Sequence, residues 1–188
     1  CEVVPVAILN MRLLPDPILR KQAKKVAKVT PQLKKLVDNM VDTMHDQRGV
    51  GLAANQVGSL QKVAVIQTPD MEEPMVLINP EIEALGEERV AGIEGCLSLP
   101  GMVGMVPRFR HIRYKALAPD GSVIEREASG YHARVVQHEC DHLDGILYPQ
   151  RMEDLSTLGY TDEMDRDELP LGARMREKEL PTEAADDG

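Results

Sequence analysis

The stretch Gln137-His138-Glu139-Cys140-Asp141-His142 places two histidines four residues apart, with a glutamate directly after the first. On a helix this spacing puts both imidazoles on one face, where they can bind one metal ion, and it leaves Glu139 beside the ion rather than bound to it. A metal-activated water and a general base are the chemistry that such a pattern serves. The alternative interpretation is a pair of surface histidines that flank an acidic helical turn.

The residues around this motif favour a helix. Ser129 can serve as its N-cap, and Gly145 can end it. Apolar residues between them recur at roughly helical spacing: Tyr131, Val135 and Val136. Cys140 lies about 200° around the helix from His138, so we expect a buried thiol on the opposite face rather than a metal ligand.

A catalytic metal site usually takes three protein ligands and keeps one position for water, so a third ligand is required. Downstream of His142 there is no histidine or cysteine, and the carboxylates of Glu153 and Glu163 are the candidates there, as in a thermolysin-like site. Upstream, Cys96 stands in a segment framed by glycines and a proline, which could present a thiolate from a strand end or a loop. One thiolate and two imidazoles form a tetrahedral site with one open position. The competing interpretation of Cys96 is a packed core thiol.

The stretch Gly49-Val50-Gly51-Leu52-Ala53-Ala54-Asn55-Gln56 combines small residues with a polar side chain at its end. Small residues let another backbone approach closely, and Gln56 can donate hydrogen bonds beside them. These features favour a substrate-lining loop. A phosphate cradle is the competing interpretation, but the stretch lacks the ending of a P-loop and the third glycine of the dinucleotide fingerprint.

Together, residues 49–56, 94–98 and 138–142 resemble the peptide deformylase family, which removes the N-formyl group from the initiating methionine of new polypeptides. The three motifs stand in the family's order, and the resemblance extends from about residue 14 to residue 149. It implies a catalytic domain over residues 1–160. The acidic residues 161–188 would form an extension that is partly helical or disordered.

The resemblance implies a role for each residue of these motifs. The metal ligands would be Cys96, His138 and His142. Glu139 would be the catalytic acid and base, while Gln56 and the backbone N–H of Leu97 would hold the formyl oxygen. The residues expected around the substrate are Val50, Gly51, Gly95, Tyr131, Arg134 and Val135. Arg108 would pair with Asp141 behind the metal helix, although most arginines are solvated surface charges.

The resemblance also implies a cofactor and partners. Ferrous iron is the expected ion, one per chain, although affinity alone favours zinc, and Zn²⁺, Ni²⁺ or Co²⁺ can substitute. The substrates would be N-formyl-methionyl nascent peptides, with a transient association with the ribosome. Val103 departs from the family pattern, in which many relatives carry an arginine that reaches the substrate entrance.

Composition limits the partners and the compartment. The net charge of −9 argues against a nucleic-acid or anionic-membrane surface as the main partner. Three cysteines, an odd number, do not form a disulfide framework. No stretch approaches the roughly 20 apolar residues of a membrane span. We therefore expect a cytoplasmic protein that neither reads nucleic acid nor enters a membrane.

Apolar periodicity predicts an α+β fold, with antiparallel or mixed sheets packed around the metal-binding helix and with an N-terminal helix. That N-terminal helix should begin at Thr30-Pro31 and bury one stripe, formed by Leu33, Leu36, Val37, Met40, Val41 and Met44. The expected strands are residues 62–67, 75–79, 81–90, 111–118 and 122–128. Pro119-Asp120-Gly121 should make the turn between the last two.

Two other functions are compatible with the sequence. A zinc endopeptidase would use Glu153 or Glu163 as its third ligand and would keep its metal after Cys96→Ala. A metal-stabilised binding module without turnover would respond to Glu139→Ala only through a change in local charge.

Overall fold

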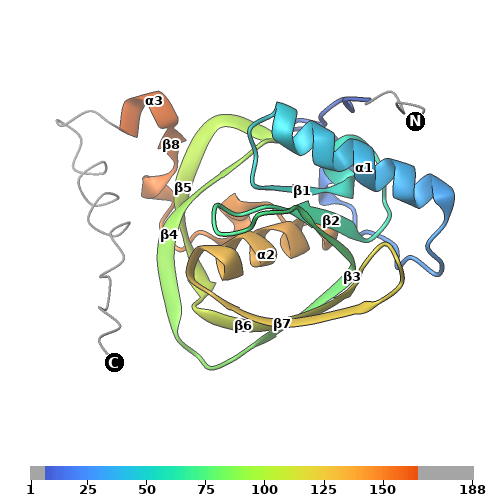
Figure 1. The fold of residues 1–188 in the computed structure, drawn as a ribbon. Coiled ribbons are helices and arrows are strands. Elements are labelled where there is room, and N and C mark those ends of the chain that lie inside the picture. Colours follow the sequence, from blue (N-terminus) through green and yellow to red (C-terminus); the bar gives the residue numbers. More distant parts are fainter. Residues whose placement is uncertain (1–6, 165–188) are drawn as a thin grey trace.

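One helix, α2 (Gly130–Leu143), runs through the middle of the fold and is surrounded by β-strands (Figure 1). A second helix, α1 (Pro31–Asp46), lies outside these strands and packs over β1 and β2. The computed structural model describes residues 7–164. The α+β class, the central position of the metal-motif helix and the N-terminal helix are all confirmed.

Within residues 7–164 the strands form two sheets, in which the named strands pair antiparallel. The larger sheet has the order β1-β2-β3-β6-β7, and its strands are Gly51–Ala53, Val63–Ile66, Met75–Ala84, His111–Leu117 and Val123–Ser129. The smaller sheet has the order β4-β5-β8, and its strands are Arg89–Cys96, Leu99–Phe109 and Gly159–Tyr160. The remaining short helices are η1 (Pro17–Arg20), η2 (Ala54–Val57), η3 (Tyr148–Arg151), η4 (Leu155–Thr157) and α3 (Thr161–Met164).

The hairpin of β6 and β7 agrees with the sequence prediction to within one residue at each end. Its turn is closed by the N–H of Gly121, which donates to the carbonyl of Ala118 at 2.9 Å. Gly121 has a φ of +85°, which glycine adopts without strain. The Pro-Asp-Gly turn is therefore confirmed, and so is the strand that precedes β3.

The boundary expected between strands 75–79 and 81–90 is wrong. β3 continues to Ala84 through an irregularity in register between Ile78 and Glu81. Asn79 adopts a φ of +53° there, and its side chain binds both the N–H and the carbonyl of Val26, at 2.7 and 2.9 Å. These hydrogen bonds hold a bulge that accommodates Pro80 without ending the strand.

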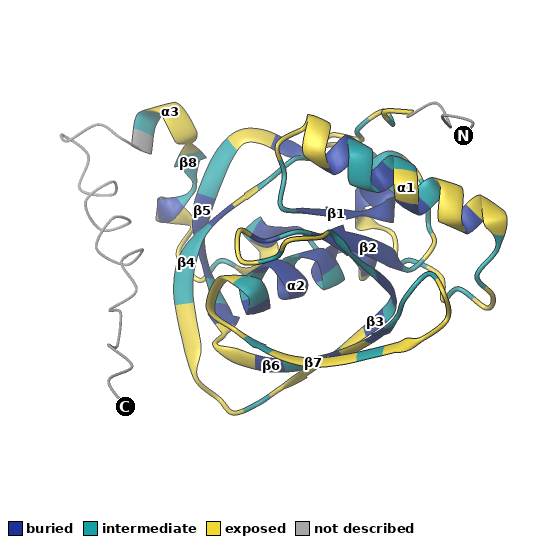
Figure 2. Ribbon diagram, in the orientation of Figure 1, coloured by how far each residue is buried: buried dark blue, intermediate teal, exposed yellow. Residues whose placement is uncertain are grey.

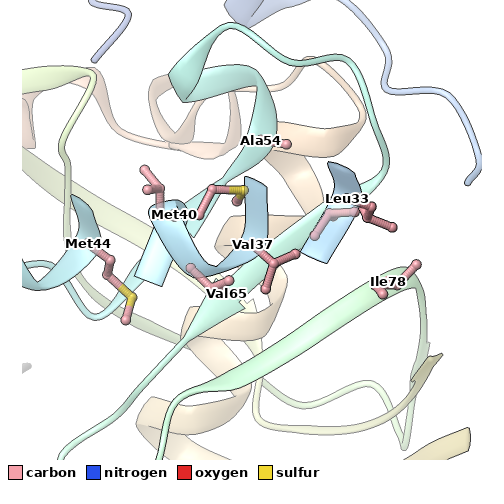
Figure 3. Packing of buried hydrophobic residues seen from close by; sticks show 9 residues of the cluster. Leu33, Val37, Met40, Met44, Ala54, Val65 and Ile78 are labelled. Atoms are coloured by element: carbon pink, nitrogen blue, oxygen red, sulfur yellow. The ribbon is translucent and has the colours of Figure 1, made fainter. Parts of the chain in front are cut away.

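The α1 helix begins where the sequence predicts, because the Thr30 hydroxyl accepts the N–H of Leu33 at 3.1 Å. Its predicted stripe faces the larger sheet (Figure 3). The fully or almost fully buried members are Leu33, Val37, Met40 and Met44, which pack with Leu52, Val63, Val65 and Ile78. Leu36 and Val41 are partly buried against the same core.

Several polar side chains of α2 are buried. Figure 2 shows this helix enclosed by the sheets. Its buried polar side chains are Gln137, Glu139, Asp141 and His142. Burying an ionisable group costs free energy unless the group is paired or binds a metal, so these residues mark the candidate site.

No helix among residues 7–164 is long and apolar enough to cross a bilayer. Most of the predicted acidic extension, residues 165–188, lies outside the described residues.

We expect Met40→Ala to lower the free energy of unfolding by about 2–4 kcal/mol, because it leaves a cavity between α1 and the larger sheet. Met40 is 0% exposed, whereas Leu155 is 65% exposed and provides the control as Leu155→Ala. Urea denaturation followed by circular dichroism measures both. Equal effects of the two substitutions would contradict the packing of α1 described above.

Candidate metal centre

The ends of α2 fix the histidine motif in space. Ser129 occupies the N-cap position as predicted, although its side chain makes no capping hydrogen bond. At the other end Gly145 has a φ of +74°, and its N–H donates to the carbonyl of His142 at 3.0 Å. A Cβ on Gly145 would lie 2.6 Å from the carbonyl oxygen of Arg20. Glycine is therefore required just after the end of the helix, and His142 lies in the last helical turn.

Three side chains converge between α2 and the end of β4, and we call them the donor triad: Cys96, His138 and His142. Nε2 of His142 lies 3.2 Å from Sγ of Cys96 and 3.2 Å from Nε2 of His138. Cys96 is the last residue of β4, so the sequence prediction of a thiolate at a strand end agrees with its position. Within residues 7–164 the triad is the only group of such side chains arranged to hold a metal ion.

The triad fits a tetrahedral metal site. An ion about 2.1 Å from each nitrogen and about 2.3 Å from sulfur separates its ligand atoms by roughly 3.3–3.6 Å, close to the distances within the triad. Burial lowers the pKa of His142 well below its usual value, which keeps this imidazole neutral and able to bind a metal. A thiolate with two imidazoles also suits zinc or a neighbouring divalent transition metal.

Glu153 does not belong to this group. Its carboxylate pairs with Arg89 at 3.0 Å, and its side chain is 69% exposed. Glu163, in α3, is not part of the triad either. Cys140 lies elsewhere on α2, partly buried against a separate apolar cluster, and burial raises the pKa of its thiol. It is not a ligand, as the helical spacing predicts.

The carboxylate of Glu94 holds His138 in place. Its Oε2 lies 2.8 Å from Nδ1 of His138, so a proton on Nδ1 is donated to Glu94 and the Nε2 lone pair faces the triad. Arg108 donates two hydrogen bonds to Glu94, at 2.8 and 2.9 Å, and Arg134 adds a third at 2.9 Å. Burial alone would raise the pKa of Glu94, but Arg108 and His138 lower it to about 2. The carboxylate therefore stays ionised.

Arg108 also reaches Asp141 on α2, with Nη1 2.5 Å from Oδ2, so the predicted pair is present. Arg151 donates to both oxygens of Asp141, at 2.8 and 3.0 Å. The sequence interpretation missed Glu94 and Arg151. Glu94 stands two residues before Cys96, and in a strand this spacing places both side chains on one face. That spacing, together with the usual carboxylate partner of a metal-binding histidine, was the available signal.

Glu139 lies against the backbone of β1. A Cβ on Gly51 would be 2.2 Å from Oε1 of Glu139, so only glycine permits this approach. The Glu139 side chain is buried, and its Oε2 has no hydrogen-bond partner among the described residues. Burial raises the pKa of Glu139 to about 7. A carboxylate in this range can both take and give a proton near neutral pH.

The amide of Gln56 is held in one orientation. Its Oε1 accepts the N–H of Ala53 at 2.9 Å, while its Nε2 donates to the Ser98 hydroxyl at 3.1 Å and lies 3.5 Å from Sγ of Cys96. The donor end of the amide therefore faces the triad. Leu97, whose N–H the sequence interpretation singled out, follows Cys96 directly and lines the cleft that opens beside the triad.

A cleft with a volume of about 560 Å³ opens beside the triad and Glu139, between the segment before β1 and the β4–β5 edge. All of the residues predicted to surround a substrate line it: Val50, Gly51, Gly95, Tyr131, Arg134 and Val135. Val103 lines it as well. The structure thus brings together motifs that are separated by more than 80 residues in the sequence.

The comparisons with known proteins all indicate the same protein family. Residues 8–157 match the family model described as polypeptide deformylase. Peptide deformylase 1 of Bordetella pertussis is 49% identical over 165 residues, which cover 83% of this chain and 92% of that protein. The crystal structure of peptide deformylase from Thermotoga maritima is 40% identical, with a TM-score of 0.76, and covers 79% of this chain and 99% of that one. A Met-Ala-Ser-bound class I type b peptide deformylase from Acinetobacter baumannii is 34% identical, with a TM-score of 0.74, over 79% of this chain and 100% of that one.

Glu94→Gln should weaken metal binding by about 10- to 100-fold, because the neutral amide orients His138 less strongly than the carboxylate does. Competition with a chelator measures the dissociation constant. Glu88→Gln is the matched control, since Glu88 pairs with Arg110 on the exposed surface. If Glu94→Gln folds normally and binds metal as tightly as the parent, Glu94 does not position the ligand.

Proposed function

Because this chain belongs to the polypeptide deformylase family, we propose that it hydrolyses the N-formyl group of the initiator formyl-methionine in newly synthesised polypeptides and releases formate. The donor triad beside Glu139, within the segment that matches the family, is the observation that carries this function. The zinc endopeptidase alternative lacks support, because neither Glu153 nor Glu163 belongs to the donor triad and the Glu153 carboxylate pairs with Arg89 instead.

Cys96, His138 and His142 would hold the metal ion, which when bound polarises a carbonyl and lowers the pKa of a neighbouring water. Glu139 takes a proton from the attacking water and passes it to the departing amine of methionine. Its raised pKa and its lack of a competing hydrogen bond at Oε2 suit both transfers.

Gln56 and the backbone N–H of Leu97 stabilise the oxygen of the formyl group as it gains negative charge. The hydrogen bond from the Ala53 N–H to Oε1 of Gln56 supports this role, since it turns the amide N–H groups toward the triad. The amide therefore needs little reorganisation during the reaction.

The shape of the cleft suits a formylated peptide. A formyl carbon bears only hydrogen, so a narrow space beside Gly51 and Glu139 admits it and refuses bulkier acyl groups. Val50, Tyr131, Val135 and the stem of Arg134 would surround the methionine side chain. Backbone pairing along Gly95 would hold the peptide as an added strand. The relative from Acinetobacter baumannii was solved with Met-Ala-Ser bound, which supports a methionyl peptide as the ligand of this family.

We further propose that ferrous iron is the native ion, one per chain, and that the protein acts in the cytoplasm with a transient association with the ribosome. The catalytic domain would be residues 1–160, and residues 161–188 would be an acidic extension. The family match to residues 8–157 supports this boundary.

Formate release from formyl-Met-Ala-Ser tests the function directly. We expect turnover with this peptide and about 10- to 200-fold less with acetyl-Met-Ala-Ser, since the extra methyl group would have to enter the narrow space beside Gly51 and Glu139. Cleavage of internal peptide bonds without formate release would overturn the assignment.

We expect Glu139→Ala to keep the metal and to reduce kcat by about 10²- to 10⁴-fold, with the larger end favoured because one carboxylate serves both proton transfers. Atomic absorption should still find about one metal ion per chain. Activity within tenfold of the parent would remove Glu139 from the mechanism.

Metal reconstitution should distinguish the ions. Protein loaded with Fe²⁺ under anaerobic conditions should be highly active and should lose activity in air, because the thiolate and the ion are both oxidisable. The Ni²⁺ or Co²⁺ forms should persist, and the Zn²⁺ form should turn over more slowly. Equal, air-stable rates of formate release from the iron and zinc forms would contradict the proposal of iron but not the assignment of the triad as the metal ligands.

A further inference from the structure

Arg48 occupies a backbone position that normally favours glycine. It follows the C-cap of α1, Gln47, and has a φ of +55°. Its N–H donates to the carbonyl of His45 at 3.0 Å, and the N–H of Gly49 donates to the carbonyl of Met44 at 2.9 Å. This hydrogen-bond pattern is a Schellman motif, whose left-handed residue is usually glycine because a side chain is disfavoured there. An arginine at such a position calls for a reason beyond the fold.

The Arg48 side chain is exposed and lines the substrate cleft. Among residues 7–164, no side chain forms an ion pair or a hydrogen bond with its guanidinium. The nearby carboxylate of Asp46 accepts instead from the Gln47 amide, at 2.9 Å.

Apart from Glu139 beside the donor triad, the other charged groups along the cleft are already engaged. Glu94 binds Arg108, Arg134 and His138. Arg134 also donates to the carbonyls of Val106 and Val90, at 2.7 Å each. In the described part of the cleft, Arg48 is therefore the cation whose charge is not engaged in an ion pair or a side-chain hydrogen bond.

The order of residues along one wall places Arg48 away from the chemistry. Gly51 touches Glu139, Gly49 approaches the side chain of Leu97, and Arg48 comes one residue further toward α1. A peptide whose formyl group lies beside Glu139 would pass Gly51 first and Arg48 later. Arg48 would then meet residues that follow the methionine.

We propose that Arg48 is a specificity-determining residue, which favours formylated peptides with acidic side chains at the third and fourth positions over peptides with basic ones there. This inference rests on the proposed function. The proposed preference is the local effect of the Arg48 charge on the cleft wall. The net charge of the whole chain, −9, has the opposite long-range effect and favours basic peptides. The effect of Arg48 is thus the change in preference when its charge is removed or reversed.

The test uses amidated peptides, formyl-Met-Ala-Xaa-Xaa-amide, in which both variable residues are Glu, Gln or Lys. The measured quantity is the ratio of kcat/KM for the Glu peptide to that for the Lys peptide. Arg48→Glu should lower this ratio by roughly tenfold at low ionic strength, as expected for exposed charge pairs that change sign. In 1 M salt the difference should nearly vanish, since the Debye length falls to about 3 Å.

Lys28→Glu is the matched control, because it changes the net charge equally on an exposed loop before α1 and outside the cleft. It should leave the ratio within about twofold of the parent. Arg48→Gly separates this role from a structural one: glycine suits the left-handed position, so the melting temperature should stay equal or rise while the ratio falls.

The outcomes are distinguishable. No formate from the Gln peptide would overturn the proposed function itself. If formate is released but Arg48→Glu and Lys28→Glu change the Glu-to-Lys ratio equally, only the role of Arg48 is overturned. The same conclusion follows if the change in ratio caused by Arg48→Glu persists in 1 M salt.

Discussion

The buried carboxylate of Glu94 is the interaction on which the site depends. It receives hydrogen bonds from Arg108 and Arg134 and binds the ring of His138, so it connects β4, β5 and α2. Removing one partner from such a buried network typically costs about 3–5 kcal/mol, because an uncompensated charge remains. The relative positions of the two strands and the helix are therefore fixed by charge as well as by apolar packing.

This constraint orients the side chains of the donor triad. Cys96 stands two residues after Glu94 on the same strand, and His138 is turned toward it by the same carboxylate. One turn further along α2 from His138, Asp141 is held by Arg108 and Arg151. A site whose ligands are already oriented loses less conformational entropy when it binds a metal.

Much of this arrangement could be predicted from the sequence, because its signals are local. The spacing of His138 and His142 predicted a helix and a shared face, and Gly121 predicted a hairpin. The bulge at Asn79 was missed, since it depends on hydrogen bonds to Val26, 53 residues away. The role of Glu94 was missed for a similar reason, because its partners on β5 and α2 are adjacent only after folding.

X-ray absorption at the edge of the bound metal tests the central claim most directly, that Cys96, His138 and His142 together hold one ion. The predicted first shell has one sulfur at about 2.3 Å and two imidazole nitrogens at about 2.0–2.1 Å. Cys96→Ala should remove the sulfur contribution from that shell. A first shell without sulfur in the parent protein, made of oxygen and nitrogen alone, would contradict the account.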